Sequence, residues 1–187
     1  MKPITTWSDV TIEKYRQLIQ IKDENPTSKM LGILSVLSGM SKRDLMKLKA
    51  TELEPLIRQF QFTNVPMTNK VTRTFNLGDI KYGLIPDLNS LSIGEIIDLE
   101  EYLANWESSI HKLVAILYRP IVKEDLVGYE IEPYDGSRAS VWAEWFDQEL
   151  SIEVVYGATL FFSTIASVSW ISTMNSSMET TQILNLI

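Results

Sequence analysis

The sequence predicts a mainly α fold of the α+β class, a multi-helix domain with one small β-hairpin near residues 70–85. Three observations predict this fold. Apolar residues recur at helical spacing over residues 8–62 and again over residues 92–173. The apolar period changes to two between residues 70 and 85. Residues that can cap helix ends precede the helical stretches.

The length of 187 residues is typical of one domain, so we expect residues 1–187 to form a single domain. A hydrophobic share of 45% is enough for a packed core. The predicted parts are a helical N-terminal subregion over 8–62, the hairpin over 70–85, a helical core over 92–173 and a polar tail over 174–187.

The N-terminal subregion is predicted to be a cluster of short helices. Each has a residue that can satisfy the helix-terminal amides, which otherwise lack partners. These start signals are Ser8 or Thr11, Thr27, a capping box at residues 41–44 and a second box at residues 51–54. Asn25 and Pro26 end the first helix, and Gly39 ends the second.

The hairpin prediction rests on alternation. Val71, Arg73 and Phe75 are spaced by two, and the same spacing resumes after Gly78, which can supply the positive φ of a tight turn. An isolated hairpin is marginal in water, so we expect it to pack on a helix or on strands of another chain.

The helical core is predicted to begin with two helices. A capping box at residues 92–95 starts the first, and Arg119 with Pro120 ends the second. Residues 121–136 are expected to form a long connection. Long connections often carry contacts, and this one contains two aromatic residues, Tyr129 and Tyr134.

An aromatic helix follows, with Trp142, Trp145 and Phe146 at helical offsets. Tryptophan is enriched at interfaces, so these residues are candidates for binding a partner. The helix also precedes the most apolar segment of the chain and is suited to pack against it. We favour the core interpretation and keep the interface as the alternative.

Residues 154–178 carry no Asp, Glu, Lys, Arg or His, and residues 154–171 are mostly apolar. That length is near the roughly 20 apolar residues that cross a bilayer. Against a membrane span are the hydroxyls of Thr159, Ser163 and Ser167 and the lack of a Lys or Arg flank. We favour a buried or subunit-interface helix, and membrane insertion of residues 154–171 is the alternative.

Composition excludes several chemistries. A net charge of -7 argues against nucleic acid as a specific partner, because phosphate binding needs a basic surface. The absence of cysteine excludes disulfides and thiolate sites. His111 is the only histidine, which excludes a two-histidine metal site, and we favour a polar helix-edge role for it over a general base.

Two acidic clusters are the remaining candidates for chemistry. They consist of Asp98, Glu100 and Glu101, and of Glu144, Asp147 and Glu149. Magnesium binding or acid–base catalysis needs carboxylates that converge in space, so solvated helix faces are favoured. We expect no enzyme activity, no catalytic residue, no cofactor and no metal, with an acidic-site enzyme as the least favoured alternative.

Residues 75–120, about a quarter of the chain, carry a resemblance to a known group of proteins. The segments concerned read LGDIKY at 77–82, PDL at 86–88, SIGE at 92–95, IDLE at 97–100, and HKL followed by AILYRP within 111–120. This pattern resembles small proteins encoded among the tail and virion genes of tailed bacteriophages, including crAss-like phages.

The resemblance implies a non-enzymatic bacteriophage protein that is virion-associated or acts in virion assembly, as a tail component, an internal cargo protein or a tail assembly chaperone. It implies a place in the virion or, during assembly, in the host cytoplasm. Partners would be other virion proteins or copies of itself, with membrane contact less favoured. The expected interaction residues are Tyr129, Tyr134, Trp142, Trp145, Phe146, Phe161, Phe162, Leu184 and Ile187.

Overall fold

The computed structural model describes residues 3–87, 90–162 and 164. The fold is mainly helical with one small antiparallel sheet, which confirms the predicted class. The elements are η1 (Trp7–Asp9), α1 (Ile12–Ile19), α2 (Pro26–Ser38), α3 (Lys42–Leu45), α4 (Ala50–Gln59), η2 (Gln61–Asn64), β1 (Thr74–Leu77), β2 (Ile80–Leu84), α5 (Ile93–Ala104), α6 (Trp106–Leu117), β3 (Tyr118–Glu124), β4 (Tyr129–Ile131) and α7 (Gly136–Glu149). Residues 152–162 are also helical.

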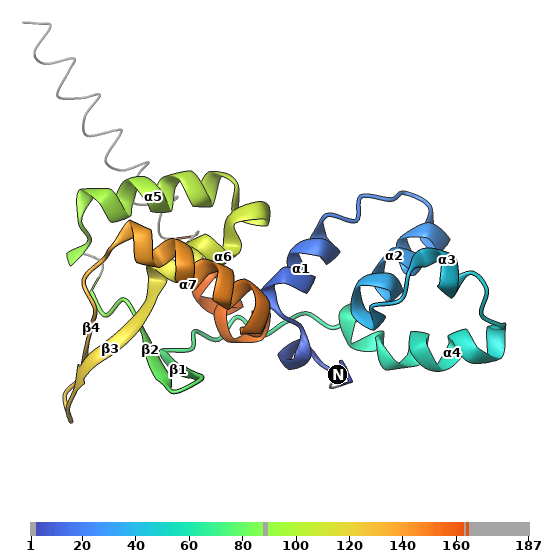
Figure 1. The fold of residues 1–187 in the computed structure, drawn as a ribbon, viewed down its shortest axis with the longest axis horizontal. Helices are drawn as coiled ribbons and strands as arrows, with labels where there is room; N and C mark the ends of the chain where they lie inside the picture. Colours follow the sequence, from blue (N-terminus) through green and yellow to red (C-terminus); the bar gives the residue numbers. More distant parts are fainter. Residues whose placement is uncertain (1–2, 88–89, 163, 165–187) are drawn as a thin grey trace, which may run out of the picture.

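The molecule is elongated, with α2, α3 and α4 at one end and the sheet with α5, α6 and α7 at the other (Figure 1). Helix α1 lies between the two ends and contacts α2, α6 and α7. Two backbone hydrogen bonds tie its start to the end of α7, from Ile12 N to Leu150 O at 3.0 Å and from Ile152 N to Val10 O at 2.9 Å. The single domain over residues 1–187 stays a prediction.

Three of the predicted helix starts and one predicted end are confirmed. The side chains of Thr11, Ser41 and Ser92 accept hydrogen bonds from the amides of Lys14, Asp44 and Glu95. Gly39 ends α2 in the left-handed conformation, with φ at 75°, which costs a glycine no steric clash.

Two helix starts were predicted at the wrong residue. Helix α2 is capped by Asn25, whose side-chain oxygen accepts from the Thr27 amide at 3.0 Å, because an Asn at this position reaches the amides of the first turn. Helix α4 begins after Lys49, whose amide donates to the Glu52 carboxylate at 2.8 Å. The box predicted two residues later therefore does not start this helix.

The sheet has the strand order β1-β2-β3-β4, and every neighbouring pair is antiparallel. Strands β1 and β2 are the predicted hairpin, with Gly78 at φ 57° in its turn. The predicted connection over residues 121–136 is wrong in part, because β3 and β4 form a second hairpin there. Pro120 and a register shift between Ile121 and Lys123 conceal this strand in the sequence, since proline is rare in central strands.

The core lies between the sheet and the helices that cover it. In helix α6 every residue from Leu113 to Leu117 is buried. Burial on all sides is typical of a helix that is enclosed by neighbouring elements. The ring of Tyr82 lies 5.0 Å from that of Phe146 and 5.3 Å from that of Phe75, centroid to centroid. Phe146 is 0% exposed, so its side chain belongs to the core and does not face a partner.

The described part of the uncharged segment consists of residues 154–162, which belong to the helix over residues 152–162, and of Thr164. Val155 and Ala158 are fully buried, whereas Phe161 is 45% exposed. Gly157 lies so close to the backbone of Lys70 that a Cβ atom there would overlap the Lys70 carbonyl oxygen. Within the residues that the structure describes, no helix is long and apolar enough to cross a membrane. The rest of residues 154–178 lies outside the described residues, apart from Thr164.

Candidate interaction surface at the β3–β4 hairpin

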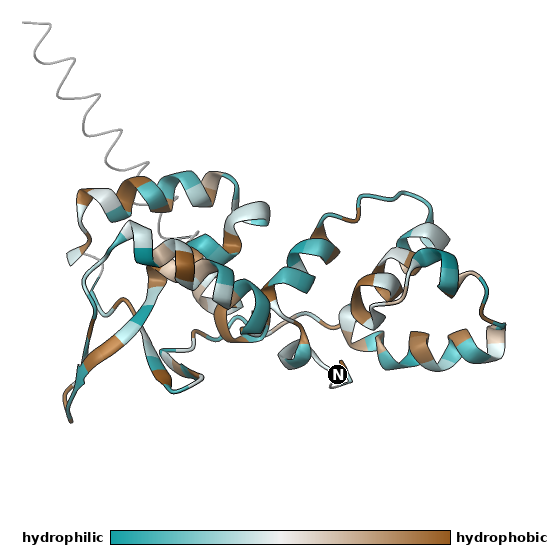
Figure 2. Cartoon of the chain, viewed as in Figure 1, coloured by the Kyte–Doolittle hydropathy of each residue, from teal (hydrophilic) through white to brown (hydrophobic). Residues whose placement is uncertain are grey.

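The β3–β4 hairpin extends beyond the helices that cover the sheet (Figure 1), and Figure 2 shows hydrophobic stretches along it. Its turn is fixed by the side chain of Asp125, whose Oδ1 accepts from the amides of Val127 at 2.8 Å and Gly128 at 3.1 Å. Leu126 and Val127 in this turn are 106% and 98% exposed. Two neighbouring apolar side chains are therefore held in water by an ordered turn.

Tyr129, the first residue of β4 after the turn, anchors the hairpin to β2. Its ring lies across β3 against Gly83 of β2, where an added Cβ atom would overlap Cε2 of the ring and lie 2.8 Å from Cδ2. The phenol hydroxyl donates to the Leu84 carbonyl oxygen at 2.8 Å. Glycine is thus required at position 83 for this close approach.

Two ion pairs stabilise the β3–β4 hairpin, called the arm below. One joins it to β2 and the other joins its own two strands. Lys81 on β2 lies 2.6 Å from Glu124, and Lys123 lies 2.9 Å from Glu130. All four side chains are largely exposed, so each pair contributes about 1 kcal/mol at most. These pairs balance the charges of Lys123, Glu124 and Glu130, the charged residues of the two strands next to the turn.

A groove of about 570 Å³ lies beside the hairpin. Its walls are mostly apolar and include Leu84, Ile85, Phe161 and Phe162, together with Val127 and Gly128 from the hairpin turn itself. Arg73 is the one charged residue among the described residues that line this groove. Within the described residues, the Arg73 guanidinium has no ion-pair or hydrogen-bond partner.

A second groove, of about 550 Å³, adjoins the first at Pro86 and Tyr129, which line both. It is polar, and its floor includes a buried ion pair between Arg119 and Glu95 at 2.9 Å, with side chains 11% and 6% exposed. Burial lowers the pKa of Arg119, against the opposing effect of Glu95. The Glu95 carboxylate also accepts from the amide of Ser92 at 2.7 Å, so this pair is built into the start of α5.

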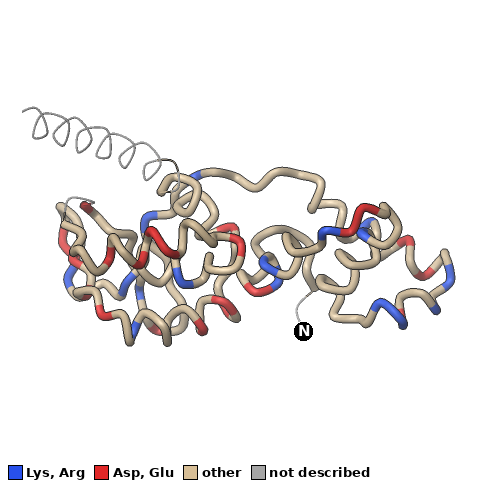
Figure 3. Tube along the Cα trace, turned by 90° about the horizontal axis from the view of Figure 1, so that it is seen from above, with Lys and Arg blue, Asp and Glu red and all other residues tan. Residues whose placement is uncertain are grey.

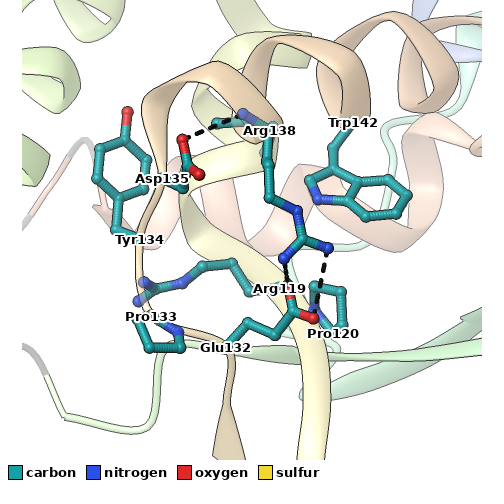
Figure 4. A pocket seen from close by; sticks show the side chains of 10 residues that line it. Arg119, Pro120, Glu132, Pro133, Tyr134, Asp135, Arg138 and Trp142 are labelled. Atoms are coloured by element: carbon teal, nitrogen blue, oxygen red, sulfur yellow. Dashed lines mark hydrogen bonds and ion pairs between the residues drawn. The ribbon is translucent and has the colours of Figure 1, made fainter.

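A small pocket next to the polar groove is lined mainly by side chains of β3, α7 and the β4–α7 connection (Figure 4). The Arg138 guanidinium donates to the Glu132 carboxylate at 2.9 Å and lies 5.9 Å from the centre of the Trp142 ring. Tyr134 donates a hydrogen bond from its hydroxyl to the Asp98 carboxylate. Burial is the main cause that raises the pKa of Tyr134, and Asp98 raises it further.

The carboxylates of the two acidic clusters do not converge on one site. Asp98 is bound to Tyr134, and Asp147 pairs with Arg16 at 2.8 Å. In the described part of the chain, no group of three or more metal-ligating side chains is placed to hold a metal ion. Figure 3 shows basic and acidic residues interspersed at both ends of the molecule.

His111 lies on α6 near the Arg16–Asp147 pair, at the junction of α1, α6 and α7. Its Nδ1 is buried without a hydrogen-bond partner. Burial is the main cause that lowers the pKa of His111 to about 4, and the nearby charge of Arg16 lowers it in the same direction. The imidazole is therefore neutral at physiological pH.

No protein-family model, curated protein or solved structure matches this chain.

The structure brings four of the predicted interaction residues to the two grooves. Tyr129 lines both, Tyr134 lines the polar one, and Phe161 and Phe162 line the apolar one. Phe162 is only 5% exposed, so its edge alone is accessible.

The other predicted residues lie elsewhere. Trp142 and Trp145 are half-buried against the sheet, with rings 5.7 Å and 6.3 Å from that of Tyr82. Leu184 and Ile187 lie outside the described residues.

Sequence reasoning missed the hairpin turn and Arg73. The available signal at the turn was the pair Leu126 and Val127 enclosed between Asp125 and Gly128, a combination typical of a tight turn with exposed apolar residues. Nothing in the sequence marks Arg73, because its lack of a partner depends on which residues the fold places around it.

Proposed function

We propose that this chain is a non-enzymatic virion-associated or virion-assembly protein of a tailed bacteriophage, acting by protein–protein packing as a tail component, an internal cargo protein or a tail assembly chaperone. The phage setting rests on the resemblance of residues 75–120. The packing function rests on one observation, the full exposure of Leu126 and Val127 at the end of an anchored hairpin.

The energetics favour a docking role for this hairpin. Burying a Leu or Val side chain contributes about 1.5–3 kcal/mol, so covering both residues of the turn supplies roughly 3–6 kcal/mol before the costs of association. Because Asp125 already holds the turn and Tyr129 ties the start of β4 to β2, little further ordering is needed when a partner binds. An ordered arm with an apolar end is suited to insert into a neighbouring protein.

The polar groups near the hairpin support the same function. Arg119 is paired with Glu95, Arg138 with Glu132, and Tyr134 with Asp98. These pairings hold Glu95, Glu132 and Tyr134 in the wall of the second groove, whereas Nε of Arg119 is buried without a hydrogen-bond partner among the described residues. The charges of these groups are thus paired within the chain, and the exposed apolar side chains of the turn remain for a partner.

The test is the assembly of infectious particles by the phage that encodes this chain. Leu126→Ser with Val127→Ser should reduce the yield of infectious particles, because the docking arm loses its apolar end. The matched control is Met46→Ser with Val65→Ser, two residues that are 66% and 60% exposed and lie outside the hairpin and its grooves. A normal yield from the hairpin variant, with the chain expressed and folded, would refute the proposal.

A membrane-active protein is the second candidate. The observation that favours it is the exposure of Leu160 and Phe161, 36% and 45%, in the described part of residues 154–171. Flotation of the purified chain with liposomes tests this function. Failure to float with either neutral or anionic vesicles would exclude it.

A further inference from the structure

Among the described residues, Arg73 is the one charged residue that lines the apolar groove, and its exposed side chain has no ion-pair or hydrogen-bond partner there. The groove walls are otherwise formed mainly by apolar side chains, among them Leu84 and Phe161. A guanidinium in such a setting favours a partner with one carboxylate beside apolar residues, since a charge-assisted hydrogen bond strengthens where water is excluded. The groove therefore favours an occupant that carries apolar side chains next to a carboxylate.

The hairpin turn carries that combination. Asp125 is followed directly by Leu126 and Val127, both of which point into solvent. Oδ1 of Asp125 is used by the turn, accepting from two amides, whereas Oδ2 has no hydrogen-bond partner within the described residues. The neighbouring acids of the arm, Glu124 and Glu130, are already paired with lysines. Asp125 is therefore the carboxylate of this arm that can accept from a second molecule.

We propose that the occupant of the apolar groove is the hairpin turn of a second copy of this chain. Asp125 of each copy pairs with Arg73 of the other, and Leu126 and Val127 of each copy enter the other's groove. This inference names the partner for the packing function proposed above and rests on that function.

The position of the turn favours a closed pair over an open chain of copies. Val127 and Gly128 belong both to the turn and to the groove lining, so the inserted and receiving surfaces are contiguous on one molecule. When two such contiguous surfaces meet about a two-fold axis, each contact is made twice and the assembly closes at two copies. The charge contact and the apolar contact are then both formed in duplicate.

The test uses charge exchange between two variants of the full chain, Arg73→Glu and Asp125→Lys. Wild type should sediment as a dimer in analytical ultracentrifugation. Each variant alone should dissociate with a Kd at least roughly tenfold higher, because like charges then face each other in both contacts. An equal mixture of the two should restore the dimer, because both cross-contacts again join opposite charges.

Asp125→Lys also removes the side chain that holds the turn. Leu126→Ser with Val127→Ser is therefore measured in parallel, because it keeps Asp125 and should weaken the dimer without changing the circular dichroism spectrum. A wild-type chain that sediments as a monomer overturns the inference. A dimer whose Kd is unchanged by all of these substitutions overturns it as well. If the same serine variant still lowers the yield of infectious particles, the packing function stands and its partner is a different protein.

Discussion

Gly83→Ala is expected to loosen the β3–β4 hairpin by displacing the Tyr129 ring. The added methyl group would overlap Cε2 of the ring, lie 2.8 Å from Cδ2 and lie 3.0 Å from Cγ1 of Ile121. The backbone itself tolerates alanine, because the positive-φ glycines among the described residues are Gly39 and Gly78. The substitution therefore acts through the ring and not through backbone strain.

The magnitude follows from three contributions. Displacing the ring loses the hydrogen bond from Tyr129 to Leu84, about 0.5–1.5 kcal/mol. Overpacking costs about 1–3 kcal/mol, and restricting the unfolded chain returns about 0.4–1 kcal/mol. The free energy of unfolding should fall by about 2 kcal/mol, which lowers Tm by about 4–8 °C in a chain of this size.

The assay is urea unfolding followed by circular dichroism, in a double-mutant cycle with Tyr129→Ala. Once the ring is gone, Gly83→Ala should cost little, so the coupling free energy between the two positions should be about 2 kcal/mol. Gly94→Ala is the control, because its Cβ atom would meet nothing closer than Ser92 Oγ at 3.9 Å. Equal costs of Gly83→Ala with and without Tyr129 would refute the reasoning.

Three further predictions concern buried groups. The pKa of His111 is lowered from 6.5 to about 4 in the folded protein. Between these two pH values the unfolded chain binds a proton at His111 and the folded chain does not, so acid favours unfolding. Stability should therefore fall as pH drops from 6.5 to 4, by roughly 2–3 kcal/mol. Gly157→Ala should lower Tm strongly, because the Lys70 carbonyl it meets is backbone, and overpacking costs about 1–3 kcal/mol. Arg119→Met should cost about 3–5 kcal/mol in urea unfolding, because Glu95 is left buried without its partner.

Each of these has a measurement that separates it from a general loss of stability. His111→Phe should flatten the stability profile between pH 6.5 and 4, and an unchanged slope contradicts the assignment. Gly128→Ala, with open space around its Cβ position, should leave Tm nearly unchanged. Arg58→Met breaks an exposed ion pair and should cost at most about 1 kcal/mol. A comparable cost for Arg58→Met and Arg119→Met would show that burial of the Arg119 pair has no effect.

Local patterns predicted the fold where the controlling interactions are local. Ser41 and Ser92 mark helix starts because a cap needs only the next three residues, and Gly78 marks the turn because positive φ is a property of one residue. The start of α2 was predicted two residues too late because Asn25 and Thr27 can both act as N-cap residues. Which of them is used depends on where the chain enters the helix.

The second hairpin could not be predicted in the same way. Strand β3 contains Pro120 and a register shift, and its pairing with β2 joins residues 34 to 38 positions apart. Such pairing is decided by which strands the core helices bring together. Tyr129 and Tyr134 were predicted to lie in a connection. Pairing with β3 places Tyr129 in β4. The long-range pairing of β3 with β2 then holds this hairpin in the sheet, where Tyr129 lines both grooves and Tyr134 lines the polar one.

By itself, the sequence determined that this protein is mainly helical, that α1, α3 and α5 begin at the predicted caps, that the 70–85 hairpin forms, and that the chain carries a long uncharged segment. These properties depend on periodicity and on neighbouring residues. Only the tertiary structure decided that Phe146 is buried, that Leu126 and Val127 are exposed, and that Arg73 lines an apolar groove without an ion-pair partner among the described residues. Burial and charge balance are properties of everything packed around a side chain, and the sequence does not contain that arrangement in local form.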